Sequence, residues 1–216
     1  EINGSYDANG IDLVEGVIAE VDSLVVGPGW GISDENALFL GELLQVIPDH
    51  LPTLFDADGL KLLKQVENWW EFIPEKSILT PHPGEMSVLT GLDIDQIQAN
   101  RWEIAQEYAS RWQVSLLLKS AVTVVAAPEG DLYVNPVSEP ALATAGSGDV
   151  LSGVIGGLLA QGVDRTKAAA MGAWLHGRAG EVAREKISSD IIVTAMDILA
   201  GIPASFQDAI GLEDQV

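Results

Sequence analysis

Short apolar runs alternate along the chain with longer stretches in which apolar residues recur at helical spacing. Apolar runs bounded by turn residues predict buried strands, and apolar residues three or four apart predict helices with one buried face. Strands are predicted over 23–27, 53–55, 77–79, 114–118, 122–126 and 131–134. Helices are predicted over 34–47, 60–65, 95–112, 148–161 and 165–184, and a last helix begins with 194–200.

The order of these elements predicts the fold class. Alternation of strands and helices is typical of an α/β protein with a mostly parallel sheet and helices on both faces. The turn 128–131 joins the last two strands into a hairpin, which adds antiparallel pairing. Ala169 and Gly172 allow close helix packing, and Thr194 with Asp197 forms a helix-start signal. No repeat or linker interrupts the pattern, so we predict one domain over residues 1–216.

Charge and composition narrow the classes of partner. The 216 residues carry 32 acidic and 11 basic side chains, a net charge of -21. Such a surface repels nucleic acid and anionic lipid, so we expect neither partner. The chain has no cysteine, which excludes disulfides and thiolate chemistry and is compatible with the cytoplasmic location that we expect. No apolar stretch reaches the length of a membrane span.

Four loops follow predicted strands or open a predicted helix, where sites form in open α/β sheets. The first, 27–31, reads Gly-Pro-Gly-Trp-Gly. Its glycines let a ligand approach the backbone closely, and an ordinary tight turn is the alternative. The spacing is not the dinucleotide fingerprint Gly-x-Gly-x-x-Gly, so it predicts no Rossmann site.

The second loop, 80–85, holds His82 between two prolines and ends on Glu85. A histidine in so rigid a turn is typical of a ligand contact rather than of a core. Glu85 either gives a favourable charge at a helix start or helps to organise Mg²⁺ indirectly.

The third loop, 119–123, starts with Lys119, which ends a strongly apolar run. Its ammonium suits a phosphate, and the hydroxyls of Ser120 and Thr123 suit further hydrogen bonds. A solvated turn is the alternative for this segment.

The fourth loop, 143–149, runs through small residues into a buried helix. Free amides at a helix start bind phosphate, because they have no partner within the helix and carry partial positive charge. Asp149 would stand beside such an anion, where a carboxylate suits a base that deprotonates a hydroxyl.

Asp56 and Asp58 end another strand and suit a metal or a ribose, but for them we favour the capping of the short helix after Gly59. His50 and His176 show no metal-ligand spacing, and neither a Gly-x-Ser-x-Gly elbow nor a Walker motif occurs.

Together these motifs resemble those of the ADP-dependent NAD(P)H-hydrate dehydratases, which have a ribokinase-like three-layer α/β/α fold. The matching stretches are VVGPGWG (25–31), FDADGL (55–60), LTPHPGE (79–85), LK (118–119), LATAGSGDVLSG (142–153) and AWLHG (173–177). They cover nearly the whole chain in the family's order. Gly-Ser-Gly-Asp alone would indicate only the wider kinase superfamily.

The resemblance implies repair of hydrated NADH and NADPH (NADHX and NADPHX). The ring hydroxyl is phosphorylated by ADP, with ATP as the other donor, and phosphate is then eliminated with release of AMP. By resemblance, Gly29, Gly31 and His82 contact the substrate, and Asp149 binds it and acts as the base. The nucleotide contacts carried over are Lys119, Ser120, Ala121, Val122, Thr123, Gly146, Ser147 and Gly148. Mg²⁺ would bridge phosphate oxygens.

The chain departs from the family at a few positions. Ser120 and Ala145 stand where glycine is frequent, and Trp30 replaces a smaller aliphatic residue and either stacks on a ring or packs. Family domains also begin with a strand and a Gly-rich segment that precede the first residue here, so we expect an N-terminally incomplete domain. An epimerase domain fused before it and a homotetramer are further expectations from the resemblance.

Two other functions fit the same residues. A vitamin-precursor kinase would keep Gly-Ser-Gly-Asp but is not expected to combine it with Thr-Pro-His-Pro-Gly-Glu. A non-catalytic nucleotide-binding module would keep the phosphate loops without turnover.

Overall fold

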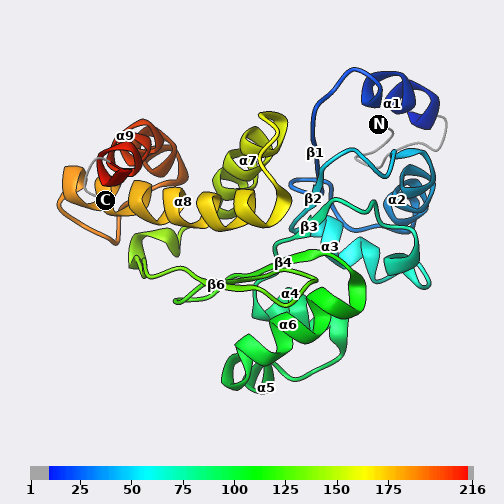
Figure 1. The fold of residues 1–216 in the computed structure, drawn as a ribbon, viewed down its shortest axis with the longest axis horizontal. Coiled ribbons are helices and arrows are strands. Elements are labelled where there is room, and N and C mark those ends of the chain that lie inside the picture. The colour runs from blue at the N-terminus through cyan, green and yellow to red at the C-terminus, as the bar shows by residue number, and fades with distance from the viewer. Residues whose placement is uncertain (1–9, 214–216) are drawn as a thin grey trace.

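The computed structural model describes residues 10–213 as a six-stranded sheet with helices on both faces (Figure 1). The strands are β1 (Leu24–Val26), β2 (Thr53–Phe55), β3 (Ser77–Leu79), β4 (Ser115–Leu118), β5 (Val124–Ala126) and β6 (Leu132–Val134). The helices are α1 (Ile11–Ile18), α2 (Asp34–Val46), α3 (Asp58–Leu63), α4 (Pro83–Thr90), α5 (Ile94–Ala99), α6 (Arg101–Trp112), α7 (Ser147–Ala160), α8 (Arg165–Ile187) and α9 (Ala195–Glu213), with short 3₁₀ turns η2 (Trp69–Glu71) and η3 (Pro140–Leu142).

The strands lie in the order in which they occur along the chain. β1, β2, β3 and β4 pair in parallel, and β5 and β6 add an antiparallel edge. The predicted mostly parallel sheet with a late hairpin is therefore confirmed. Right-handed crossovers between sequential parallel strands place their helices on one face. The opposite face is covered by α7 and α8, which follow the last strand.

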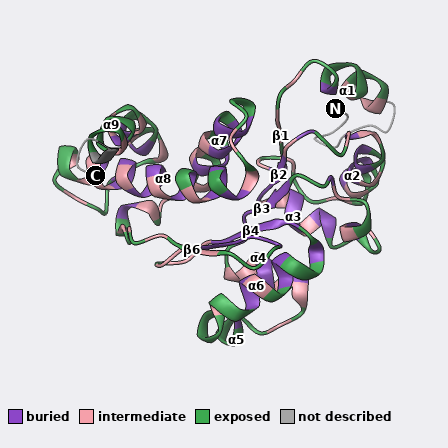
Figure 2. Cartoon of the chain, viewed as in Figure 1, coloured by how far each residue is buried: buried purple, intermediate pink, exposed green. Residues whose placement is uncertain are grey.

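Two apolar layers form because alternate side chains of each strand point to opposite faces. Val26, Phe55, Leu79, Leu116 and Ala126 pair in register across five strands and belong to the cluster that includes α2 to α6. The intervening positions pack on α7 and α8. Burial on both faces explains why every position of β2 to β5 is buried and why apolar and polar residues do not alternate there, and Figure 2 shows these strands buried.

Small residues let α7, α8 and the sheet approach closely. A Cβ atom at Gly172 would lie 2.4 Å from Ile155 Cγ1, and one at Gly156 would lie 2.7 Å from Val25 Cγ2. The expected close helix packing is confirmed, and it brings the first turn of α7 against the end of the sheet.

Some element boundaries were wrong. The predicted helix 95–112 is two helices, because the amide and side chain of Asn100 both donate to the Gln96 carbonyl and end α5, while the Asn100 carbonyl starts α6. The last helix continues past residue 200 to Glu213, with Pro203 inside it, and α1 had not been predicted. Within residues 10–213 no helix combines the length and apolarity needed to cross a bilayer.

Candidate active site

The carboxyl ends of the parallel strands meet at one edge of the sheet. Backbone hydrogen bonds continue past the strands. The amide of Asp56 donates to the Val26 carbonyl at 3.0 Å, and that of Thr80 to the Phe55 carbonyl at 3.2 Å. The amide of Lys119 donates to the Pro81 carbonyl at 2.8 Å. Two of the loops singled out from the sequence and the aspartate that ends β2 are therefore fixed side by side.

A charged network lies at this edge. The Lys119 ammonium is 2.7 Å from Asp56 Oδ1 and 3.8 Å from Glu85 Oε2. The other Asp56 oxygen accepts a 2.7 Å hydrogen bond from Ser152 Oγ on α7. Asp56 is 1% exposed, whereas the Lys119 side chain is 21% exposed, so the cation keeps access to a ligand while its counter-ion is buried.

The favoured capping role of Asp56 was wrong. α3 begins at Asp58, its N-cap residue is Ala57, and no side chain caps it. The Asp56 carboxylate is instead used by Lys119 and Ser152. Asp58 does lie in the first turn of α3, where it accepts a 3.0 Å bond from the Gly31 amide.

The start of α7 and the Lys119 ammonium converge on one point. Gly146 precedes the helix with a positive φ of 83°, so the chain turns sharply into Ser147. A Cβ atom at Gly148 would lie 3.8 Å from Lys119 Nζ and 3.7 Å from Asp56 Oδ2. The amides of Ser147, Asp149 and Val150 already donate to the carbonyls of Thr144 and Gly146, which leaves the Gly148 amide as the donor beside the ammonium. The Gly148 amide and the Lys119 ammonium, at the positive end of α7, make an anion-binding cradle, which a side chain at 148 would fill.

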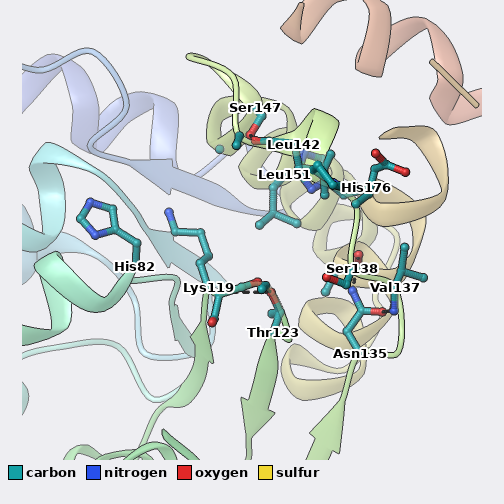
Figure 3. Close-up of a pocket in the computed structure, with 17 residues that line it drawn as sticks. His82, Lys119, Thr123, Asn135, Val137, Ser138, Leu142, Ser147, Leu151 and His176 are labelled. Carbon is teal, nitrogen blue, oxygen red and sulfur yellow. Dashed lines mark hydrogen bonds between the residues drawn. The ribbon is translucent and has the colours of Figure 1, made fainter. Parts of the chain in front are cut away.

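A cavity of about 750 Å³ opens beside this cradle, within the range of small-molecule sites. Figure 3 shows Lys119 between His82 on one side and Leu142, Leu151 and His176 on the other. Of the predicted site residues, the cavity is lined by His82, Lys119, Ser120, Ala121, Thr123, Ser147 and Gly148. The remaining lining is mostly apolar and comes from Asn135, Val137, Ser138, Glu139, Pro140, Leu142, Ala143, Leu151, Ala173 and His176.

Other predicted residues lie outside that lining: Gly29, Gly31, Glu85, Val122, Gly146 and Asp149. Asp149 is exposed in the first turn of α7, one residue after the cradle glycine. The anion cradle therefore has the cavity on one side and an exposed carboxylate beside it.

His82 is the N-cap of α4 as well as a cavity residue. Its Nδ1 accepts hydrogen bonds from the amides of Gly84 and Glu85 at 3.0 and 3.2 Å. Glu85 returns the contact, because its Oε2 accepts from the His82 amide at 2.9 Å. A nitrogen that accepts amide hydrogens carries no proton, so the neutral ring is protonated at Nε2. The protonated Nε2 lies 3.4 Å from Glu85 Oε1, and the side chain is 54% exposed, so the ring is open to a ligand.

The loop 119–123 is folded on itself. Thr123 Oγ1 donates to the Ser120 carbonyl at 3.2 Å and accepts from the Ser120 amide at 3.4 Å. Ser120 Oγ accepts a 3.2 Å bond from Arg101 on α6. Both hydroxyls therefore hold the loop in shape, and the ammonium of Lys119 is its charged group facing the cavity.

The first glycine turn is shaped by backbone packing. Gly27 has φ 115°, and a Cβ atom there would lie 2.1 Å from the Asp56 carbonyl oxygen. Gly29 also has positive φ, but within residues 10–213 no atom apart from those of its chain neighbours lies within 4 Å of the position of its missing Cβ. Trp30 packs edge to face on Phe39 with ring centroids 5.7 Å apart, so packing is one role of this departure from the family.

Sequence reasoning missed His176. It lies on α8, is 6% exposed and lines the cavity. Burial lowers the pKa of its imidazole from 6.5 to about 4, a backbone hydrogen bond with Ser147 opposes this, and the charge of Lys119 adds to it. The ring is neutral at pH 7. A lone histidine in a helix without ligand spacing gives no signal of this in the sequence.

The placement of the metal-ligating side chains bears on how Mg²⁺ could bind. Among residues 10–213 no group of three or more His, Asp or Glu side chains is placed to hold a metal ion. Mg²⁺ at phosphoryl-transfer sites is commonly held by phosphate oxygens, water and one or two carboxylates. A Mg²⁺ ion would enter with the phosphates that the cradle at Gly148 suits. Glu85 lies 3.8 Å from the Lys119 ammonium of that cradle, and Asp149 follows Gly148 in the chain.

A ribokinase-like superfamily protein of Enterococcus faecalis shares this fold, with a TM-score of 0.74 and 26% identity over 93% of this chain and 68% of that one. The sequence profile described as NAD(P)H-hydrate dehydratase matches residues 12–204. The chain therefore belongs to the NAD(P)H-hydrate dehydratase family.

Individual relatives agree with this assignment. The chain is 41% identical over 214 residues to the bifunctional NAD(P)H-hydrate repair enzyme Nnr of Moorella thermoacetica, covering 99% of this chain and 39% of that protein. It is 39% identical over 170 residues to the ADP-dependent (S)-NAD(P)H-hydrate dehydratase of Neisseria meningitidis, covering 77% of this chain and 56% of that protein. The chain spans between about a third and just over half of the length of such curated relatives.

A solved structure of a related enzyme has the same fold. The ADP/ATP-dependent NAD(P)H-hydrate dehydratase of Bacillus subtilis, co-crystallised with ATP and Mg²⁺, aligns with a TM-score of 0.74 and 28% identity. The alignment covers 90% of this chain and 69% of that one.

Proposed function

We propose that this protein dehydrates (S)-NADHX and (S)-NADPHX to NADH and NADPH, using ADP and releasing AMP and phosphate. The observation that carries the proposal is the cradle at Gly148, where the start of α7, Lys119 and an apolar cavity meet beside an exposed carboxylate. Family membership and the names of the relatives support the substrate and the donor.

The cavity would bind the nucleoside part of the nucleotide, and the cradle would bind its phosphates. Its apolar wall suits the adenine ring, and Lys119 with the helix start suits the phosphates. Lys119 already balances Asp56 and Glu85, so its position is set before a ligand arrives. Prior positioning of this kind lowers the barrier, because phosphoryl transfer depends mainly on orientation and charge neutralisation.

Asp149 is the proposed base. Its carboxylate takes the proton of the hydroxyl on the hydrated ring, the hydroxyl oxygen bonds to the terminal phosphorus of ADP, and the bond from phosphorus to the bridging oxygen breaks to release AMP. In the second step the carbon–oxygen bond of the phosphorylated ring breaks and phosphate departs with its electron pair. The neighbouring ring carbon gives its proton to water, and the electron pair of that carbon–hydrogen bond forms the double bond of the dihydronicotinamide. Phosphate leaves more readily than hydroxide, which explains why a phosphoanhydride is consumed.

Gly29, Gly31 and His82 are the proposed contacts of the hydrated nicotinamide nucleotide. The first two have positive φ and exposed backbone, and His82 presents Nε2. Mg²⁺ would be held by the phosphates, with Glu85 reaching it through water, and it would neutralise charge on the transferred phosphoryl group. ADP as the preferred donor rests on the family, and ATP is the alternative.

The direct test mixes the protein with NADHX, ADP and Mg²⁺ and follows the return of NADH absorbance together with the release of AMP and phosphate. A longer version that includes any preceding segment is assayed in parallel. Recovery of NADH with equimolar AMP supports the proposal. A stable phosphorylated product would indicate a vitamin-precursor type of kinase, and nucleotide binding without product in both versions would indicate a non-catalytic module.

Asp149→Asn tests the role of the base. We expect turnover to fall by a factor of about 10²–10⁴ while ADP binding, measured by calorimetry, stays nearly unchanged. The matched control is Asp12→Asn, which removes the same charge from the first turn of α1. Undiminished turnover of Asp149→Asn would remove this residue from the mechanism.

We also propose that the protein forms a homo-oligomer, a tetramer by family resemblance. Exposed apolar side chains follow one another along α9 and support the idea of a contact between copies: Met196, Leu199, Phe206 and Ile210. Sedimentation equilibrium gives the mass directly, and Met196→Glu together with Leu199→Glu should shift it toward the monomer. A monomeric parent protein would overturn this proposal.

A further inference from the structure

We propose that His176 is a nucleoside contact: its Nε2 accepts a hydrogen bond from an N–H or O–H group of the adenosine part of the nucleotide. The inference rests on the proposed use of the cavity for an adenine nucleotide. It assigns a residue that would contact the adenosine part of that ligand, which carries no charge.

The first observation is an unsatisfied buried atom. Among residues 10–213, His176 Nε2 is the one buried side-chain nitrogen or oxygen without a hydrogen-bond partner. A buried polar atom left without a partner costs about 1–3 kcal/mol, so such atoms are rare in folded proteins and usually serve a ligand or bound water. Since His176 also lines the cavity, a ligand there is placed to supply the partner.

The polar neighbours are already engaged. Ser147 Oγ donates to the Leu142 carbonyl at 2.6 Å. Asn135 donates to the Ala173 carbonyl at 3.0 Å and accepts from the Val137 amide at 3.2 Å. Small rearrangements of these side chains would therefore break existing bonds in order to satisfy His176.

The ring's tautomer decides which ligand group fits. A backbone hydrogen bond with Ser147 favours the charged ring, so it involves a ring N–H and a carbonyl oxygen. Nε2 has no partner, and the contact therefore belongs to Nδ1. In a neutral imidazole the second nitrogen is then a lone-pair acceptor. The lowered pKa of His176, about 4, keeps the ring neutral throughout the physiological range.

An acceptor cannot pair with an ionised phosphate, whose oxygens are acceptors as well. The donors of an adenine nucleotide are its exocyclic amino group and its ribose hydroxyls. The surroundings agree, because His176 lies beside Leu142 and Leu151, while Lys119 marks the phosphate end (Figure 3). The geometry therefore assigns His176 to the nucleoside end.

The test uses ¹⁵N-labelled imidazoles in the intact protein, which has only three histidines. The His176 signals are those lost in His176→Leu. We expect saturating ADP or AMP to shift the His176 Nε2 resonance in the direction of an accepted hydrogen bond, and pyrophosphate to leave it in place. ADP that binds without moving this resonance overturns the proposal, and a shift caused by pyrophosphate overturns the nucleoside assignment.

Affinities give a second readout. His176→Leu should weaken AMP binding about fivefold, which corresponds to one hydrogen bond of about 1 kcal/mol, and should leave pyrophosphate binding unchanged. His176→Gln keeps an acceptor near the position of Nε2 and should retain most of the affinity, and the exposed His50→Asn is the control. A purely structural histidine would change stability in these variants without this pattern of affinities.

Replacing the amino group with a keto group in inosine diphosphate, or removing either ribose hydroxyl, identifies the donor. The analogue that lacks it should bind parent and His176→Leu equally. If ADP binds and moves His176 but NADHX is never dehydrated, the proposed function fails and this inference stands. If dehydration occurs with an unmoved His176 resonance, the reverse holds.

Discussion

Asp56 should stabilise the fold through Lys119, and Asp56→Asn measures by how much. The carboxylate is 1% exposed and receives two hydrogen bonds of 2.7 Å, one from a charged ammonium. Asparagine keeps the shape but removes the charge and replaces one acceptor oxygen with a donor. Losing a hydrogen bond to a charged group costs about 1.5–3 kcal/mol, and removing one partner of a fully buried pair costs about 3–5 kcal/mol.

Lys119 is 21% exposed and can recover water, so the lower range applies and we expect a loss of about 2 kcal/mol. For a chain of this length, 1 kcal/mol moves the melting temperature by about 2–4 °C, which gives a fall of about 4–8 °C. Thermal unfolding at pH 7 followed by circular dichroism measures it. The control is Asp58→Asn, whose 3.3 Å pair with Lys61 is only partly buried, with side chains 23% and 36% exposed, and contributes less than about 1 kcal/mol. Equal melting temperatures for the two variants would refute the reasoning.

Three further perturbations probe other features of the structure. Gly27→Ala should lose about 3–5 kcal/mol in urea unfolding, because its Cβ would lie 2.1 Å from the Asp56 carbonyl oxygen, whereas Gly29→Ala, with open space, should lose about 1–2 kcal/mol. Ser33→Ala removes the side chain that caps α2 by accepting from the Asn36 amide at 3.1 Å, and should lose about 1 kcal/mol in the same assay. Stability should also decline by at most about 3 kcal/mol as the pH falls from about 6.5 to about 4, because His176 binds its proton more weakly in the folded than in the unfolded chain. Urea unfolding across that range, with His176→Leu as the variant that lacks this contribution, measures it.

Each of these has a contrary outcome. Equal stability of the two glycine variants would show that the turn relaxes around a methyl group at position 27. An unchanged midpoint for Ser33→Ala would mean that water replaces the cap. A pH profile of His176→Leu that declines as steeply as that of the parent protein would assign the loss to other groups.

Much of the fold could be predicted because its strands are buried on both faces. Leu54 and Ile78 sit in runs too short and too apolar for a surface helix, and the helical stretches between them imply parallel pairing. The break at Asn100 could not be predicted, since the apolar spacing continues through it and only the two competing hydrogen bonds to the Gln96 carbonyl reveal it.

The site was predictable where it follows the strand ends and not elsewhere. Lys119 was found because a parallel sheet brings its carboxyl ends together, and Gly148 because small residues run into the start of a buried helix. Asp56 was misassigned, because an aspartate shortly before a helix looks the same whether it caps that helix or is buried against a lysine. The cavity wall at 135–143 is largely irregular chain with no periodicity to detect, and His176 acquires its properties only from tertiary burial.

The network at the strand ends also bears on how the protein unfolds. Asp56 and Glu85 belong to elements packed on one apolar layer, while Ser152 belongs to a helix of the other. A nucleotide in the cradle would touch both layers, and therefore neither could open while it stays bound. Ligand at 100 times its dissociation constant would add about 2.7 kcal/mol to the stability of the whole unit. Nucleotide supply would then set the lifetime of the folded chain against proteolysis as well as its rate of turnover.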